Sequence, residues 1–478
     1  MADNTRLQNQ EFLHRFYYFL LALLGLNLLF VVLRLVSSGY VFFDDIEHLR
    51  AAYFVSNGEV PYRDFFEHHH PLFWYVLAPL VAILPHNTVL AVYSGRIVCL
   101  CISLVTFFYI YKIEKRFIGG KICALICLNL YFWSNGDTPT SSLFFIKPDI
   151  IQRCFWFIGL YYLFGYFHYK KIRDLHICAI SFTLSFLFLQ TAAFLFFPLV
   201  VPIGYFLYKN PQRFSDFIKA SVFPLLLLGA VVLWLLKLGI FNQYLELNWS
   251  LNSFLAQLWL GLPFPYKAVS VLPLLALLSF FVYLRRRKTN PYYLILCFLF
   301  ACELLLRLHL TYVDHYCQIL IIYASLIAAP LFRKNRLCLI LFFCAATLNT
   351  FAEFIHMPIN TFASYKILDE EPYGININSG VFTKRVSYYW SHTLAETVHD
   401  IHFHTVNDYD VNKLAEKYPP KYIYFFPQWS DGEYKLLQQK LSPQQLNIFA
   451  KHYIHGDILN NYTHVKTFIY QKKEDVDD

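Results

Sequence analysis

The sequence predicts a mainly α-helical fold. We expect a polytopic bundle of about 11 transmembrane helices, amphipathic juxtamembrane helices in the first outer loop, and a small C-terminal α/β domain outside the membrane. Three observations support this. Of 478 residues, 57% are hydrophobic and 15% are charged, against roughly 25% charged in soluble domains. Apolar runs near the ~20 residues that cross a bilayer recur along the chain. After His356 the composition turns polar.

Eleven apolar runs form the predicted spans. They are Phe16–Val36, Val89–Tyr111, Phe117–Trp133, Ile150–Tyr169, Leu175–Gln190, Ala192–Tyr208, Ala220–Leu238, Ala268–Leu284, Tyr292–Leu308, Val313–Phe332 and Leu337–Ile355. Pro71–Leu84 has only 14 residues and an internal proline, which favours a helix at the membrane interface. The outer segment Gly239–Lys267 shows helical spacing of apolar residues and is also expected along the membrane surface.

The basic residues set the orientation. If Pro71–Leu84 does not cross the membrane, five basic clusters fall on one side, and if it does cross, all five lie outside. The clusters are Lys112/Lys115/Arg116, Lys170/Lys171/Arg173, Lys209/Arg213, Arg285–Lys288 and Arg333/Lys334/Arg336. The positive-inside rule therefore predicts a cytoplasmic N-terminus and an outer C-terminus. Because the positive charge is divided in this way, the net charge of +8 does not indicate a nucleic-acid partner.

Two domains are expected. Residues 1–356 form the transmembrane domain, in which the first outer loop, 37–88, carries the site. Residues 357–478 form a soluble extracytoplasmic α/β domain. Its predicted elements are a helix at Val411–Lys417 and strands at Lys421–Phe426 and Thr467–Gln471. Pro419 and Pro420 are expected to prevent the helix from continuing.

The first outer loop begins with an acidic pair. Asp44 and Asp45 follow the first span closely, which places two carboxylates at the bilayer surface, where they could act as a general base or as metal ligands. Asp44 and His48 are four residues apart and share a face if this stretch is helical. The alternative is that this loop is acidic only because outer loops tolerate acidic residues.

A second motif in this loop combines a carboxylate with imidazoles. The stretch from Gly58 passes through Arg63 and ends in the run Glu67–His70, followed by Pro71. One carboxylate and three imidazoles could supply two metal ligands or phosphate donors, although consecutive residues of a helix point in different directions. An interfacial polar patch is the alternative interpretation.

Cations gather at the outer ends of the spans. Lys147 and Asp149 open the fourth span, and Arg153 lies one turn further, so Asp149 can pair with Arg153 or favour the helix N-terminus electrostatically. Further outer cations are Arg34, Arg96, Arg307, His309 and His315. Because guanidinium groups suit phosphate, these residues predict a lipid phosphate at the outer leaflet, with snorkelling as the alternative.

These residues resemble the integral-membrane glycosyltransferases of the GT-C type, whose members include protein O-mannosyltransferases and the bacterial transferase that puts aminoarabinose on lipid A. The likeness lies in the acidic pair, the stretch Gly58–His70, the Lys-Pro-Asp entry to the fourth span and the outer C-terminal domain. It covers about the first 170 residues, and the remainder mainly by topology.

The resemblance implies a hexosyl- or pentosyltransferase in a bacterial inner membrane. It would move a sugar, with inversion, from a polyprenyl-phosphate carrier to a lipid, glycan or protein acceptor on the outer face, among membrane lipids. The implied catalytic residues are Asp44 as base or acceptor-orienting group, Asp45 beside it, and Asp149. The implied substrate or phosphate ligands are His48, Arg63, His68, His69, Lys147, Arg153, Arg307 and His315. Glu67 and His70 would hold a divalent metal (Mg²⁺, Mn²⁺ or Zn²⁺). Relatives often carry Lys where this chain has His68.

Two other function classes stay open. A transporter or flippase of a lipid-linked or anionic solute commonly shows internal repeats and polar helices near the midplane, whereas here the ionisable residues gather at the outer ends. An inactive scaffold with an outer binding domain would tolerate loss of Asp44 and Asp45. Sequons at Asn248 and Asn461 lie on the predicted outer side and matter only in a host that glycosylates exported chains.

Overall fold

The computed structural model describes the helices of the membrane part and four strands near the C-terminus. The described residues are 2–37, 43–64, 67–84, 88–133, 143–250, 252–253, 276–277, 279–281, 290–310, 318–333, 340, 344, 374–376, 422–424, 462–466 and 469–472. The chain divides into two compact units. The bundle unit comprises residues 1–37, 68–72 and 96–358, and the sheet unit comprises 38–67, 73–95 and 359–478.

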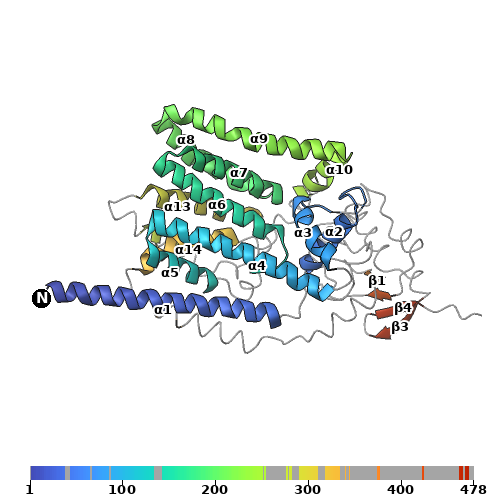
Figure 1. The fold of residues 1–478 in the computed structure, drawn as a ribbon, viewed down its shortest axis with the longest axis horizontal. Coiled ribbons are helices and arrows are strands. Elements are labelled where there is room, and N and C mark those ends of the chain that lie inside the picture. Colours follow the sequence, from blue (N-terminus) through green and yellow to red (C-terminus); the bar gives the residue numbers. More distant parts are fainter. Residues whose placement is uncertain are drawn as a thin grey trace, which may run out of the picture. The chain divides into compact units, whose positions relative to one another are not determined.

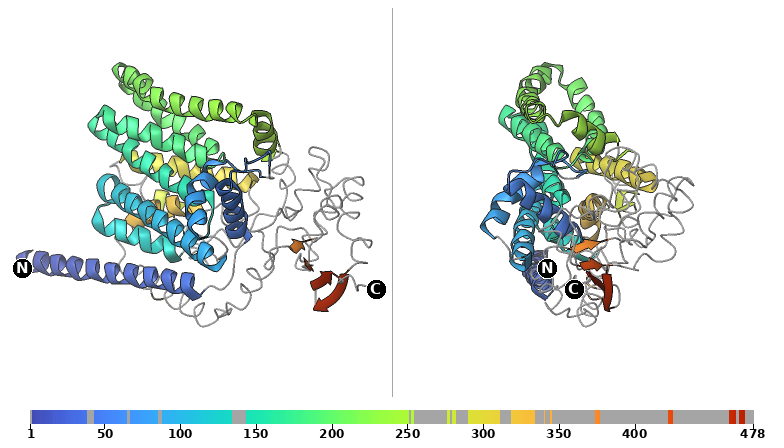
Figure 2. Two further views of the ribbon diagram at one scale, coloured as in Figure 1. Left: turned by 45° about the vertical axis from the view of Figure 1, so that its right-hand side comes forward. Right: turned by 90° about the vertical axis from the view of Figure 1, so that its right-hand side faces the viewer.

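The bundle unit consists of helices that run side by side with roughly parallel axes (Figures 1 and 2). The long helices are α1 (Ala2–Ser37), α4 (Thr88–Ile113, in this unit from Arg96), α5 (Lys121–Trp133), α6 (Pro148–Tyr169), α7 (Ile172–Phe188), α8 (Ala192–Lys209), α9 (Phe214–Lys237), α13 (Pro291–Leu310) and α14 (Gln318–Phe332). Short helical turns are η1 (Glu114–Ile118), η3 (Pro211–Arg213), α10 (Phe241–Leu245) and η4 (Glu246–Ser250).

These long helices coincide with most of the predicted spans. Nine of the 11 predicted ranges overlap one of them. The ranges Ala268–Leu284 and Leu337–Ile355 lie largely outside the described residues, so the count of 11 stays a prediction.

The helices have the length and exposure of membrane spans. Among the described residues, four stretches are long and apolar enough to cross a bilayer. They are Leu13–Val36, Leu90–Ile118, Ala192–Lys209 and Pro211–Lys237. On α8 and α9 large apolar side chains point outward, with Phe197 71% and Leu233 68% exposed. Such apolar surface fits contact with lipid. The chain is therefore an integral membrane protein.

Buried polar contacts join the helices of the bundle unit. Asn27 Nδ2 of α1 donates a hydrogen bond to Asn129 Oδ1 of α5 at 3.1 Å. Trp156 Nε1 of α6 donates to Tyr323 Oη of α14 at 2.7 Å. Polar groups away from water need such partners, and interhelical bonds of this kind contribute about 0.6 kcal/mol each in membranes.

Helix α6 has well-defined ends. Pro148 occupies its first turn, where a missing N–H removes no helical hydrogen bond. The helix ends at Lys170, which has a left-handed backbone with φ of 56° and whose N–H donates to the Tyr166 carbonyl. The Lys170 ammonium donates to the Phe167 carbonyl and lies 4.0 Å from the centre of the Phe206 ring. Pro148 and Lys170 therefore define the two ends of α6, of which the N-terminal one carries the predicted cations Lys147 and Arg153.

The sheet unit contains helices α2 (Phe43–Ser56) and α3 (Leu72–Ile83) and strands β1 (Gly374–Asn376), β2 (Tyr422–Tyr424), β3 (Tyr462–Lys466) and β4 (Ile469–Lys472). The strand order is β1-β2-β4-β3. β1 and β2 are parallel, and the other two pairs are antiparallel. β2 and β4 overlap the two predicted strands. The predicted helix Val411–Lys417 lies outside the described residues, so the C-terminal α/β domain stays a prediction.

Helix α3 corresponds to the short run that the sequence places at the interface. It has 12 residues, with Pro79 inside it. A helix of this length spans about 18 Å, well short of a hydrocarbon core of about 30 Å. Phe73, Trp74 and Leu77 are buried, so one face of α3 packs against protein. These features agree with an interfacial helix.

Candidate functional site

Helix α2 carries the acidic pair. Asp45 is completely buried, with 0% of its surface exposed, and His48 and Arg50 are also buried. A buried carboxylate needs hydrogen bonds or a positive partner to offset its desolvation, which makes Asp45 a strong site candidate. Asp44 lies in the same helix, but its side chain is outside the described part of the structure. Which of the two carboxylates is the base stays a prediction.

The orientation of His48 is fixed by helix α3. Trp74 Nε1 donates a hydrogen bond to His48 Nδ1 at 3.2 Å, and the ring of Phe73 packs edge-on at 5.2 Å. An indole N–H can only donate, so Nδ1 is the acceptor and the neutral imidazole carries its proton on Nε2. Trp74 also packs against Tyr62, and the centres of their rings are 6.2 Å apart.

Tyr62 is held in an unusual backbone conformation. Its φ is 68°, in the left-handed region that aromatic residues rarely adopt. Tyr62 is buried, so packing supports the strained conformation. Strained residues of this kind cluster at functional sites. The strained conformation of Tyr62 therefore marks the turn between α2 and the histidine run as a candidate part of the site.

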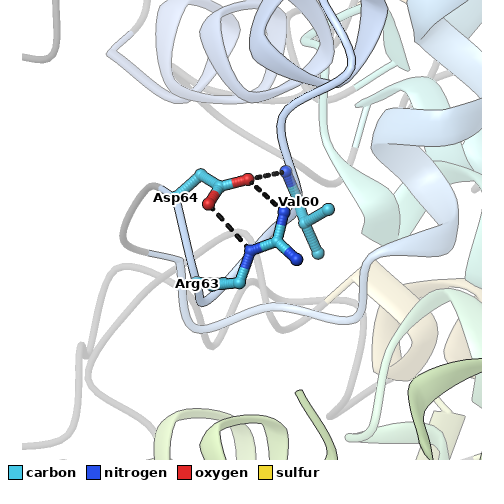
Figure 3. A network of polar contacts seen from close by, with 3 residues as sticks. All are labelled: Val60, Arg63 and Asp64. Carbon is cyan, nitrogen blue, oxygen red and sulfur yellow. Dashed lines mark hydrogen bonds and ion pairs between the residues drawn. The ribbon is translucent and has the colours of Figure 1, made fainter. Parts of the chain in front are cut away.

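The same turn engages Arg63 in an ion pair (Figure 3). Arg63 Nε donates to Asp64 Oδ1 at 2.8 Å, and Nη2 donates to Oδ2 at 2.9 Å. Asp64 Oδ2 also accepts the Val60 N–H at 2.7 Å. The Arg63 side chain is 50% exposed, so the pair is weakened by solvent. The pair uses two of the five guanidinium N–H groups, so Arg63 can hold Asp64 and still serve as the predicted phosphate ligand.

Metal-ligating side chains stand on both sides of the Glu67–His68 peptide bond. In the sheet unit, a carboxylate oxygen of Glu47 and one of Glu67 lie within 4.8 Å of each other. In the bundle unit, ring nitrogens of His68 and His69 lie within the same distance, and their ring centres are 4.1 Å apart. Carboxylate and imidazole groups are common ligands of Zn²⁺ and Mn²⁺. Either pair could therefore contribute to a metal site.

The structure changes the composition of the predicted metal set. Glu47 was not among the predicted ligands, although it lies one helical turn after Asp44, which is the spacing that could have identified it. His68 and His69, predicted as phosphate ligands, have ring nitrogens within 4.8 Å of each other, which also suits them as metal ligands. His70, predicted as a metal ligand, belongs to neither pair, because it packs among aromatic side chains.

His70 is buried against the turns that follow helix α9. Its Nε2 is hydrogen bonded to Tyr244 Oη of α10 at 3.5 Å. The rings of Tyr244, Trp249 and Phe186 surround it edge-on, at 5.6, 6.3 and 5.4 Å. Burial, together with the neighbouring His69, lowers the pKa of His70 to about 3. His70 is therefore neutral near neutral pH and anchors the histidine run.

A second polar contact ties this run to the same turns. Asn252 Nδ2 donates to the His68 carbonyl at 2.7 Å and to the Asn248 carbonyl at 2.8 Å. Trp249 Nε1 donates to Tyr244 Oη at 3.4 Å. These residues lie in the segment predicted along the membrane surface, and that amphipathic pattern was the signal that could have drawn attention to them.

The start of helix α6 gathers further predicted site residues. Lys147 and Arg153 are buried, and Asp149 is half-buried in the first turn of the helix. Arg307 lies in α13, but its side chain is outside the described part. His315 lies outside the described residues altogether. Lys147, Asp149 and Arg153 therefore share one helix end, while the roles of Arg307 and His315 stay predictions.

Arg96 is a buried cation of helix α4. It is among the largest fully buried side chains. Its guanidinium carbon lies 5.7 and 5.6 Å from the ring centres of Phe144 and Phe145. Ser103 of the same helix donates to the Leu143 carbonyl at 2.7 Å, which fixes this loop on α4. Cation–aromatic packing therefore stabilises Arg96 in the bundle unit, which also contains the cations Lys147 and Arg153.

One sequence family matches the chain. Residues 68–238 match the family described as dolichyl-phosphate-mannose-protein mannosyltransferase. The matched range includes the histidine run and the start of helix α6, and it leaves out Asp44, Asp45 and Glu67. A search of curated proteins found no match.

Solved structures show a related fold. The archaeal oligosaccharyltransferase AglB from Archaeoglobus fulgidus, in complex with an inhibitory peptide and a dolichol-phosphate, has a TM-score of 0.51 and 14% identity over 90% of this chain and 72% of that one. An oligosaccharyltransferase from Archaeoglobus fulgidus in complex with Zn and sulfate gives a TM-score of 0.50 and 14% identity over 90% of this chain and 70% of that one. The predicted resemblance to the GT-C-type membrane glycosyltransferases is confirmed.

A bacterial GT-C-type protein is also similar. ArnT from Cupriavidus metallidurans bound to undecaprenyl phosphate matches with a TM-score of 0.44 and 13% identity over 64% of this chain. The match spans 59% of the ArnT chain, so it covers only part of that protein.

Proposed function

We propose that the chain is a membrane glycosyltransferase that moves a sugar from a polyprenyl-phosphate carrier to an acceptor on the outer face of a bacterial inner membrane. The observation that carries this proposal is the run Glu67–His70. It combines a buried carboxylate with imidazoles and stands at the start of the range that matches the mannosyltransferase family. The dolichol-phosphate bound to the similar archaeal oligosaccharyltransferase supports a carrier of this kind.

The acidic pair supplies the base of the proposed reaction. The acceptor hydroxyl gives its proton to Asp44 or Asp45 as its oxygen attacks the anomeric carbon of the sugar. Attack from the face opposite the phosphate breaks the bond between that carbon and the phosphate oxygen and inverts the configuration. The complete burial of Asp45 supports this role, because a carboxylate away from water is costly unless it serves a purpose or has a partner.

The cations stabilise the leaving group. The departing polyprenyl phosphate gains negative charge, which Lys147, Arg153 and Arg307 offset. Asp149, in the first turn of the same helix, is proposed to support this site. Guanidinium and ammonium groups held in place before the reaction lower the barrier because they need no reorganisation at the moment of bond breaking.

Glu47 and Glu67 of the sheet unit form one proposed pair of metal ligands, and His68 and His69 of the bundle unit form another. Carboxylates and imidazoles suit Zn²⁺ or Mn²⁺. A divalent ion held by either pair would supply positive charge for the carrier phosphate. His48 is a further proposed ligand of the substrate.

The acidic pair provides the test. Deleting the gene in its host should cause the lipid-linked donor sugar to accumulate, and the wild-type chain should remove it. The double variant Asp44→Asn, Asp45→Asn should lower transfer by about 10²-fold or more, because an amide cannot take the proton. Mass spectrometry of extracted lipids measures the donor, and immunoblotting of membranes measures the amount of protein.

A matched control removes a carboxylate elsewhere. Glu11→Gln changes an exposed residue at the start of α1 and should leave transfer at the wild-type level. Full transfer by the Asp44, Asp45 double variant at equal protein amounts would refute the site assignment. Accumulation of the donor on the cytoplasmic leaflet alone would instead support a flippase.

A further inference from the structure

The bundle unit contains a fully buried amide without hydrogen-bond partners. The Asn248 side chain is 0% exposed, and within the described structure neither its Nδ2 nor its Oδ1 has a partner. Buried polar groups are nearly always paired, and leaving one unpaired costs about 1–3 kcal/mol. Only the Asn248 backbone is engaged by a side chain, through Asn252. Among the residues that the structure describes, no side chain or backbone group uses the hydrogen-bonding capacity of this amide.

The local backbone also marks this position. Asn248 lies in η4, a single π-helical turn. Such turns are rare and occur frequently at functional sites. The sequon that begins at Asn248 does not explain the residue, because attachment of a glycan requires an exposed asparagine. A structural reason for the amide is equally lacking, since a leucine side chain of similar size would be more stable there.

The neighbours of Asn248 have the chemistry of a sugar site. Trp249 follows it directly and is partly exposed, and its Nε1 is bonded to Tyr244 at 3.4 Å. Asn252 links this turn to the carbonyl of His68, at the start of the histidine run. Binding sites for small polar ligands combine aromatic walls with a few convergent polar groups. A single amide offers donors and an acceptor, which match a pair of neighbouring sugar hydroxyls.

We infer that Asn248 binds hydroxyl groups of a sugar unit handled by this protein, and that Trp249 packs against the sugar ring. This inference rests on the proposed glycosyltransferase function. Because Asn248 is covered, the sugar reaches it with a movement of the Trp249 side chain, whose bond to Tyr244 is long. The sugar belongs either to the carrier-linked donor or to a sugar acceptor, because both present the same hydroxyl chemistry.

Binding measurements on the full chain in lipid nanodiscs test this inference. The probes are bare undecaprenyl phosphate and a panel of undecaprenyl-phosphate-linked mannose, glucose, galactose and arabinose. Asn248→Leu keeps the approximate size and removes the polar atoms. It should weaken binding of the preferred sugar-linked carrier about tenfold, which corresponds to about 1.4 kcal/mol, and leave binding of the bare carrier unchanged. Its Tm should rise, because an unpaired buried amide is removed.

Asn252→Leu is the matched control. It removes the bonds to His68 and Asn248, so it should lower the Tm, the opposite of the change expected for Asn248→Leu. A second arm measures the KM of a sugar acceptor with the host's own donor. A tenfold rise in this KM with donor binding intact would assign the hydroxyls to the acceptor and also support the inference.

The outcomes separate this inference from the proposed function. Wild-type binding of both carrier forms, with Asn248→Leu unchanged in sugar-linked affinity and in acceptor KM, would overturn the role of Asn248 alone. A wild-type chain that binds neither the bare nor any sugar-linked carrier would overturn the proposed function together with the inference.

Discussion

At the scale of single residues, the site is made of polar groups held away from water. Asp45, His48 and Glu67 are buried in the sheet unit, and His70 is buried in the bundle unit. Trp74 donates a hydrogen bond to His48 Nδ1, and an aromatic cage surrounds His70. Burial lowers the pKa of His70 to about 3, so this residue is neutral near pH 7. The electrostatics of the site are therefore set by packing.

The buried His70 should make stability depend on pH. Its folded pKa is lowered to about 3, whereas in the unfolded chain it is near 6.5. Between these values the unfolded chain binds a proton that the folded chain does not. The free energy of unfolding is therefore fully present above about pH 6.5 and falls with decreasing pH by up to about 1.4 kcal/mol per unit. Thermal unfolding in detergent at about pH 7 and about pH 5 measures this loss.

Two variants isolate this contribution. His70→Phe keeps an aromatic ring within the cage and should flatten the dependence of Tm on pH. His14→Phe changes an exposed histidine of α1 and should retain the wild-type dependence. The same pH dependence in His70→Phe and wild type would contradict the assignment to His70.

The sequence pointed to polar residues of the first loop, several of which the structure buries, but it did not predict the state of each residue. It named Asp45, His48, Glu67 and His70 because their types gather in one outer loop. It could not foresee that Arg63 pairs with its neighbour, because that depends on the turn geometry around Tyr62. Burial and rotamer are decided by contacts with residues distant in the chain, which a linear pattern does not contain.

At the scale of elements, close packing between helices depends on small residues. A Cβ atom at Gly159 of α6 would lie 2.5 Å from the ring of Phe182, which lies on α7. By contrast, a Cβ at Gly204 of α8 would meet nothing within 4 Å. Helices in membranes use such small residues to approach each other. Gly159 is therefore a contact point between α6, which carries the cations, and its neighbour.

Alanine at these two glycines should have opposite effects. Gly159→Ala should lower the free energy of unfolding by about 1–3 kcal/mol, because the ring of Phe182 must move. Gly204→Ala should leave it unchanged or raise it by up to about 1 kcal/mol, because alanine favours the helix. Unfolding titrations with denaturing detergent, followed by circular dichroism, compare the two. Equal stability of both variants would show that the α6–α7 contact relaxes without cost.

Element boundaries show what apolar runs miss. The sequence begins the third span at Phe117, whereas α5 begins at Lys121. The difference arises at Gly119 and Gly120, whose N–H groups bond to the Glu114 carbonyl and end the preceding helix. Gly120 has φ of 85°, which favours glycine. A hydropathy pattern reports where apolar side chains occur and carries no information on this backbone turn.

At the scale of the whole molecule, the few charged residues carry most of the information on topology. The low charged fraction identifies a membrane protein, and the five basic clusters predict its orientation. The pairing of β1 with β2, by contrast, joins segments far apart in sequence and leaves no local signal. Membrane topology follows from composition along the chain, whereas sheet pairing depends on tertiary contacts.

Reporter fusions test the predicted topology. A fluorescent protein after Lys288 should mature in the cytoplasm, and alkaline phosphatase after Asp478 should be active outside, because α3 is about 12 Å too short to cross. Reversal at both points would mean that α3 spans the membrane and would place all five basic clusters outside. Reversal at Asp478 alone would leave the orientation intact and reduce or increase the count of spans after Lys288 by one. The two fusions thus separate an error in the interfacial helix from an error in the last spans.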